Sequence, residues 1–494
     1  MPRLALISLV ILSSLPSANQ AQTGDARQIL HESADAIGGL DRLRALRSVR
    51  VEETGGEYMV STITRADAPP KLIVQTMTTL RSATDTAMRR TMSQAIPMRS
   101  GRFASTTVAN HGAVATVRGS SLIPAALFDG MVATEELRLS PEAVLLTALD
   151  AADVRLARDT VFGGVRHRVV AFTLEGAPVR IFVDASSHFP TRVELIRAYP
   201  TNVFWAMWGE LRFVTTWSAW SAEPLGVWYP RQRTLTLNGA PFREYVVTAL
   251  ELDVAVSPDS IAIPDSVRAS FNARGAAERA GPSQPKLTPV EIADGVVLYQ
   301  GGYQAAAVRQ DDGVVIIEGP ESNAKSRAVL ADIGTRWPSA RVKAVVSTSP
   351  MWMHIGGLRE YAARGIPIYA LDVSVPVVRA LLGSPHTQAV DSLARVRRAP
   401  TVRAVSTTTT IGGGANRIEL RPARGQHGSS MLLAWFPASR LLYASDVVIP
   451  DAFEPVFTRA YAEELRRIVR REGLDVDRVF AEHLPAAPWG AVAR

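Results

Sequence analysis

Hydrophobic and polar positions follow two different periods along this chain, and the change of period divides it into two parts. Between residues 22 and 274, apolar residues often recur at every second position, as they do in residues 246–256. This alternation is typical of strands with one buried face. After residue 288, continuous apolar runs alternate with stretches of helical period, a pattern that indicates a layered α/β fold. The sequence therefore predicts two domains of different class.

The first domain is predicted to be an antiparallel β-rich, half-barrel-like sheet with one or two helices against it. Residues 165–183 contain two alternating runs joined through a glycine-containing turn, which indicates a hairpin. Residues 25–37 place apolar side chains on one side and end at a glycine pair, as a helix would. A serine followed by a proline opens a second predicted helix over residues 140–151.

A short segment separates the two domains. Residues 275–287 are small and polar with glycine and prolines, which predicts a linker. Beyond it, residues 342–347 and 366–370 are predicted strands, and residues 357–364 and 373–382 are predicted helices. We therefore place the domains at residues 22–274 and 288–494.

Composition restricts the classes of function. The chain has 494 residues, of which 47% are hydrophobic, enough for two sizeable cores. It has no cysteine, which excludes disulfides, thiolate metal sites and cysteine nucleophiles. The net charge of +7 comes from scattered arginines without a long basic run, so we expect a solvated surface and no nucleic-acid partner.

The first residues predict a targeting segment. Arg3 precedes the apolar run 4–15, and small polar residues lead to Ala21, as in a secretory signal peptide cleaved near Ala21 (residues 1–21). That run is too short to span a bilayer, and no other apolar run approaches about 20 residues. We expect a secreted protein, in a bacterial periplasm, that is not an integral membrane protein.

The most informative motif is a strand, a small-residue turn and the start of a helix in residues 345–358. Thr348, His354 and the Gly356-Gly357 pair resemble the metallo-β-lactamase superfamily, whose members carry Thr-His-x-His-x-Asp-His-x-Gly-Gly at this turn. Three ligand positions of that pattern hold other residues here, and they are Ser349, Met351 and Met353.

The resemblance continues over roughly residues 288–494. Residues 313–320 are similar to an early strand and acidic turn of the family, and His427 lies in a loop similar to the one that supplies another histidine. Asp446 and His483 occur where the bridging aspartate and the last histidine are expected. The resemblance implies an αββα sandwich and metal-dependent hydrolysis.

Coordination chemistry limits what the centre can bind. One of the family's two metals would meet Ser349, Met351 and His427, and a hydroxyl and a thioether are poor zinc ligands. The other would meet His354, Asp446 and His483, which suffice for one Zn²⁺ or Fe²⁺ with open positions. A two-metal centre is therefore not expected.

Three arrangements remain open at this centre. In one, a single metal stays bound, with His427 nearby as a general base or a hydrogen-bonding neighbour. In another, Met351, Trp352 and Met353 fill the space with apolar atoms and the polar residues are inherited scaffold. The third uses thioethers as soft ligands for Cu(I), although methionines beside a core more often serve as packing material.

The first domain offers a second candidate site. Residues 36–39 and 181–193 resemble the periplasmic lipoprotein carriers of LolA type, which have an open half-barrel. Large aromatic residues gather in one part of this domain, namely Trp205, Trp208, Phe213, Trp217, Trp220 and Trp228. They form either an apolar groove for a hydrophobic ligand or ordinary packing within a sheet.

The sequence thus favours a secreted two-domain protein with a degenerate metal centre, acting as an envelope binding or scaffold protein. Such a protein would take a small-molecule or hydrophobic ligand. The alternative is a single-metal hydrolase of an ester, amide or thioester bond that uses His354, Asp446 and His483. Substrate and oligomeric state are not determined, because pocket shape comes from loops.

Overall fold

The computed structural model describes residues 18–59, 70–84, 86–96, 101–281, 285–424, 431–447 and 455–492. Most of the predicted signal peptide and His427 lie outside these residues.

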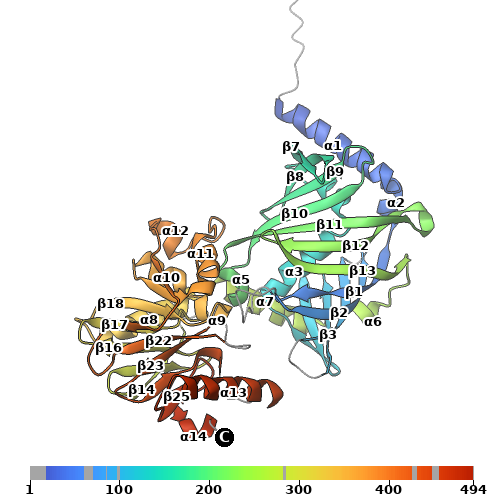
Figure 1. Cartoon of the computed structure of the whole chain (residues 1–494). Coiled ribbons are helices and arrows are strands. Elements are labelled where there is room, and N and C mark those ends of the chain that lie inside the picture. Colours follow the sequence, from blue (N-terminus) through green and yellow to red (C-terminus); the bar gives the residue numbers. More distant parts are fainter. Residues whose placement is uncertain are drawn as a thin grey trace, which may run out of the picture.

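The first domain is built on one large antiparallel sheet. In the described part of the chain, thirteen strands form it in the order β6-β5-β4-β3-β2-β1-β13-β12-β11-β10-β9-β8-β7 (Figure 1). Its strands are β1 Ser48–Tyr58, β2 Leu72–Ser82, β3 Ala87–Ala95, β4 Phe103–Asn110, β5 Ala113–Arg118, β6 Ser121–Pro124, β7 Arg155–Phe162, β8 Val165–Leu174, β9 Ala177–Asp184, β10 Pro190–Ala198, β11 Glu210–Ala222, β12 Trp228–Leu237 and β13 Ala240–Leu252. The predicted hairpin is confirmed, since β8 pairs with β9 through Leu174 and Ala177.

Helices cover parts of this sheet. They are α1 Ala18–Ala36, α2 Leu40–Ala45, α3 Leu127–Arg138, α4 Val144–Asp150, α5 Val203–Ala206, α6 Pro258–Ile261 and α7 Asp265–Arg279, with a 3₁₀ turn at Pro224–Gly226. The apolar side of α1, with Ile29 and Leu30, packs with Leu145 of α4 onto strand residues such as Phe172. Removing these side chains from water is the main stabilisation of such an interface, at about 25 cal/mol per Å² of apolar surface.

Several predicted boundaries differ from the structure, and three of these differences have a local physical cause. The helix predicted from residue 140 begins at Val144, because residues 140–143 form a separate turn in which the Ser140 carbonyl accepts from the Ala143 amide at 3.1 Å. The strand expected over 246–256 ends at Leu252, since Asp253 has a φ of 54°. The linker predicted from residue 275 starts later, because the alanine-rich stretch there has high helix propensity and α7 continues to Arg279.

The second domain has two sheets face to face. In the described residues, seven strands form a mixed sheet, β14 Thr288–Ala293, β15 Val296–Gln300, β16 Ala305–Gln310, β17 Gly313–Ile317, β18 Val342–Ser347, β19 Ile368–Leu371 and β20 Val402–Val405. Six more form the other sheet, β21 Thr409–Ile411, β22 Ile418–Ala423, β23 Met431–Phe436, β24 Leu441–Tyr443, β25 Arg478–Phe480 and β26 Ala487–Pro488. Val315 and Val346 of the first sheet share one buried core with Leu432 and Phe480 of the second.

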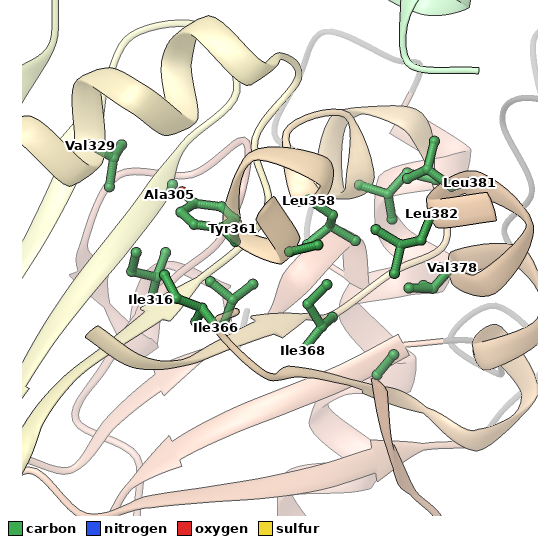
Figure 2. Close-up of a cluster of buried hydrophobic side chains, with 14 of the residues drawn as sticks. Ala305, Ile316, Val329, Leu358, Tyr361, Ile366, Ile368, Val378, Leu381 and Leu382 are labelled. Carbon is green, nitrogen blue, oxygen red and sulfur yellow. The ribbon is translucent and has the colours of Figure 1, made fainter. Parts of the chain in front are cut away.

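Helices cover the outer faces of both sheets and connect the strands. They are α8 Asn323–Arg336, α9 Trp352–Ile355, α10 Leu358–Ala363, α11 Val375–Gly383, α12 Ser392–Val396, α13 Pro455–Arg471 and α14 Trp489–Val492, with 3₁₀ turns at Asp372–Ser374 and Ser445–Val447. Figure 2 shows Leu358 and Tyr361 of α10 packed over Ile316 and Ile368 of the seven-stranded sheet. On the other side, Leu465 of α13 packs in the core of the six-stranded sheet. The layer order is α, β, β, α, so the predicted fold class is confirmed.

The two domains meet beside α5, which lies between them in Figure 1. The residues after α5 extend the core of the second domain, since Met207 belongs to it and Trp208 packs against it. Gly209 has a φ of +63°, and a Cβ there would lie 1.9 Å from the Pro385 carbonyl oxygen. Glycine is therefore required where the backbones of the two domains touch. Among the described residues, no helix is both long and apolar enough to span a membrane.

Candidate metal centre

Five polar residues converge where buried strands of the second domain end. Glu318 follows β17, and His354 lies on α9 in the turn after β18. Asp446 lies in the 3₁₀ turn after β24, and Glu482 and His483 follow β25. Because β17 and β18 are parallel, as are β24 and β25, the residues after them emerge at the same edge of each sheet. Ligands of layered α/β proteins commonly bind at such edges.

His354 is held between two buried carboxylates. Its Nε2 lies 2.8 Å from Asp446 Oδ2 in a hydrogen bond. Its Nδ1 lies 3.0 Å from Glu318 Oε2, close enough for an ion pair but outside hydrogen-bond geometry. The side chain is 0% exposed. Burial alone would lower the pKa of His354, but Asp446 and Glu318 outweigh it and raise that pKa well above 6.5.

Glu318 is fixed by its neighbours. Tyr443 donates its hydroxyl to Glu318 Oε1 at 2.8 Å, and the Thr348 hydroxyl donates to the same oxygen. Glu318 also has a φ of 78°, a left-handed backbone that costs free energy in a residue with a side chain. Strained residues of this kind concentrate at binding and catalytic sites, so Glu318 is part of the centre.

Asp446, Glu482 and His483 form the other side of the centre. His483 Nε2 lies 2.7 Å from Glu482 Oε2 and 3.5 Å from Asp446 Oδ1. Burial raises the pKa of Glu482 to about 7, although His483 opposes this rise. Burial would also raise the pKa of Asp446, but His354 and His483 hold it below its usual value. Burial and the nearby histidines therefore give the two carboxylates different proton affinities.

Several polar atoms here have no hydrogen-bond partner among the described residues. They are His354 Nδ1, Asp446 Oδ1 and both carboxylate oxygens of Glu482. Leaving such atoms buried and unpaired costs about 1–3 kcal/mol each. One nitrogen of His354 and one oxygen from each of Asp446 and Glu482 lie within 4.8 Å of one another. An imidazole with two carboxylates is a donor set that suits a divalent cation, so these residues fit one metal ion.

The positions of the replaced ligands are buried and mostly apolar. Ser349 accepts a hydrogen bond from the Met351 amide at 3.3 Å. Met351 and Met353 belong to the core that reaches α5, together with Trp352. The Trp352 ring lies 5.4 Å from that of Phe204 and 4.8 Å from that of Tyr303. The turn therefore serves as an apolar junction between the domains.

The aromatic residues predicted to form one groove lie in three separate parts of the structure. Trp205, Phe213 and Trp217 line a cavity of about 240 Å³ on the sheet of the first domain. Trp208 packs at the domain junction. The rings of Trp220 and Trp228 both contact Phe189, at 5.2 Å and 5.7 Å.

Sequence reasoning placed His354, Asp446 and His483 at the centre and missed Glu318 and Glu482. The structure brings His354 and Asp446 into contact, places His483 3.5 Å from Asp446, and adds Glu482, to which the sequence assigned no role. Both missed glutamates follow an apolar run, at residues 313–317 and 479–481. A charged residue at the end of a buried strand was therefore the available signal.

No protein-family model matches this chain, and no curated protein matches it either. Among solved structures, a metallo-beta-lactamase from Pontibacter korlensis is similar over 42% of this chain and 96% of its own, with 16% identity and a TM-score of 0.34. The metallo-beta-lactamase TMB-1 is similar over 42% of this chain and 94% of its own, with 16% identity and a TM-score of 0.33.

Proposed function

We propose that this chain is a binding protein of the bacterial envelope, secreted to the periplasm, whose second domain keeps one cation site and lacks the two-metal hydrolase centre. The observation that carries this proposal is the burial of Met351, Trp352 and Met353 in the core shared with the first domain. Apolar side chains occupy the turn that would have to supply the other metal's ligands.

Access to the centre supports a role other than hydrolysis. A hydrolytic metal needs an open position for water and for the substrate. His354 is 0% exposed, and Asp446 and Glu482 are also buried. Trp352 lies between Tyr303 and Phe204 on the side of the first domain. The side chains that could hold a metal are therefore buried among the described residues.

The cation would act on stability. Glu318, Asp446 and Glu482 bring three carboxylates next to His354, and charges buried without full compensation destabilise a fold. When bound by His354, Asp446 and Glu482, a divalent ion supplies positive charge and Lewis acidity at these oxygens. Glu318 orients His354, and His483 contacts both ligating carboxylates.

Metal content and thermal stability of the full chain test this proposal. We expect about one equivalent of zinc or iron in protein purified without chelator, and none in the Asp446→Asn and Glu482→Gln variants. Glu419→Gln, which changes a partly buried carboxylate outside the centre, is the matched control and should keep the metal. Zinc should raise the unfolding temperature of the wild type and of Glu419→Gln, but not that of Asp446→Asn or Glu482→Gln. Two equivalents of metal, or none after zinc supplementation, would contradict the proposal.

A second function, a single-metal hydrolase of an ester, amide or thioester, is favoured by one observation. The His483 side chain is 19% exposed and contacts Glu482, so it links the buried centre to solvent. A histidine in that position can carry a proton between the buried centre and solvent. Turnover of a p-nitrophenyl ester or an acyl thioester that requires metal, and that His483→Asn loses while retaining the metal, would establish this function in place of the first.

A further inference from the structure

The cavity of the first domain has two chemically different sides. Its floor is the sheet from β10 to β2, in the order β10-β11-β12-β13-β1-β2, and helix α3 contributes to its other wall. On β10 and β11 the lining is largely apolar, with Leu195, Phe213 and Trp217. On β2, β12 and β13 it includes Arg81, Arg233 and Arg243. A ligand that fills this cavity meets apolar surface at one end and guanidinium groups at the other.

The arginines are held in place by acidic neighbours. Arg233 donates from Nε and Nη2 to the two oxygens of Glu53 at 2.5 and 2.8 Å. Arg81 donates from Nε to Glu142 at 2.6 Å and from Nη2 to the Tyr229 hydroxyl at 2.8 Å. These bonds fix the planes of the guanidinium groups, which reduces the entropy lost when a ligand binds to them.

Arg243 keeps donors for a ligand. Its Nε donates to Glu57 Oε2 at 2.6 Å, and its guanidinium lies over the Phe242 ring at 4.6 Å. Neither η nitrogen of Arg243 makes a hydrogen bond within the described chain. A guanidinium with both η nitrogens available matches the two oxygens of a carboxylate.

Positive charge is crowded on this side of the cavity. Burial, together with Arg233 and Arg243, lowers the pKa of Arg90 to about 9. On α3, burial raises the pKa of Glu135 to about 7, so this acid is only partly ionised near neutral pH. Each of these arginines is paired with a carboxylate, and the partial protonation of Glu135 makes the cavity less negative than its count of acidic residues indicates.

We propose that this cavity binds an aliphatic carboxylate, with its chain along Leu195, Phe213 and Trp217 and its carboxylate on Arg243. The proposal names the ligand class for the binding role proposed above. It can fail without affecting the cation site, which lies in the other domain. Three of the lining aromatics, Trp205, Phe213 and Trp217, come from the predicted groove, but the arginines add a requirement for charge that an apolar groove lacks.

Isothermal titration of the full chain with three ten-carbon probes tests the proposal. The probes are decanoate, decanol and decyltrimethylammonium, each used below the concentration at which it forms micelles or separates from solution. We expect decanoate to bind at one site and more tightly than decanol or decyltrimethylammonium, which share its chain. Arg243→Gln should weaken decanoate roughly tenfold or more, because a hydrogen bond to a charged group is lost. Arg50→Gln is the matched control, since Arg50 lies on β1 outside the cavity and is 40% exposed; it should bind as the wild type does.

A second variant guards against loss of folding. Val132 lies on α3 and lines the cavity without contributing to the charged side, so Val132→Phe should block decanoate while circular dichroism and the unfolding temperature stay near those of the wild type. The proposal is overturned if decanol binds as tightly as decanoate, if Arg243→Gln binds like the wild type, or if none of the three probes binds. If no probe binds but the protein still binds metal, the proposal for the cavity fails and the proposal for the cation site is unaffected.

Discussion

Glu135 gives the first domain a stability that depends on pH. Its carboxylate on α3 accepts a hydrogen bond from Tyr199 at 2.7 Å and lies 3.1 Å from Arg197 Nε. Burial raises the pKa of Glu135 from 4.5 to about 7, against the opposing effects of Arg197 and Tyr199. The folded state therefore holds this proton more tightly than the unfolded state does.

The sign and the size of the effect follow from that difference. Between pH 4.5 and about pH 7 the folded state binds more protons at Glu135, so stability falls as the pH rises through this window. The stabilising contribution is fully present below pH 4.5 and is lost as the pH passes 7. A shift from 4.5 to about 7 corresponds to about 3 kcal/mol, at 1.36 kcal/mol per unit.

Glu135→Gln removes the titration and keeps an oxygen for the Tyr199 hydroxyl. The free energy of unfolding of the variant minus that of the wild type should rise by about 3 kcal/mol as the pH goes from 4.5 to 8, because only the wild type loses the contribution of the Glu135 proton. Urea unfolding across that range measures the gain through tryptophan fluorescence, because five of the nine tryptophans lie in residues 205–228. Glu251→Gln, at a 54% exposed position on the same sheet, should show no such change. Parallel pH curves for wild type and Glu135→Gln would refute the reasoning.

Three more predictions concern the domain junction and the centre. Gly209→Ala should weaken the junction by more than about 1 kcal/mol, because the new Cβ meets the Pro385 carbonyl at 1.9 Å; faster proteolysis between the domains would show this, and unchanged cleavage would count against it. Trp352→Ala should lower the free energy of unfolding by about 3–5 kcal/mol through the cavity left behind, whereas a loss below about 1 kcal/mol in urea unfolding would mean that the turn is not core. EDTA should lower the unfolding temperature of the wild type but not of Asp446→Asn, and an equal response of the two proteins would exclude a cation at Asp446.

The centre shows why a motif gives only part of a site. His354, Asp446 and His483 were recognised because their flanking residues resemble a known pattern. Glu318 lies in the segment similar to the family's acidic turn and Glu482 precedes His483, but neither was assigned to the centre from the sequence. Both reach it because two pairs of parallel strands end at the same place. The apolar role of the turn was one of three alternatives, and its contact with Phe204 of the first domain depends on how the domains pack.

By itself, the sequence determined the two domain classes, the hairpin of β8 and β9, and the alternation of strands and helices after residue 288. These features depend on the period of apolar residues and on nearby turn residues, which are local properties. Only the tertiary structure decided that buried carboxylates surround His354, and that arginines from three strands line one side of the aromatic cavity. Those groups are far apart in the chain, so their proximity arises from strand order and domain packing, which local periodicity does not encode.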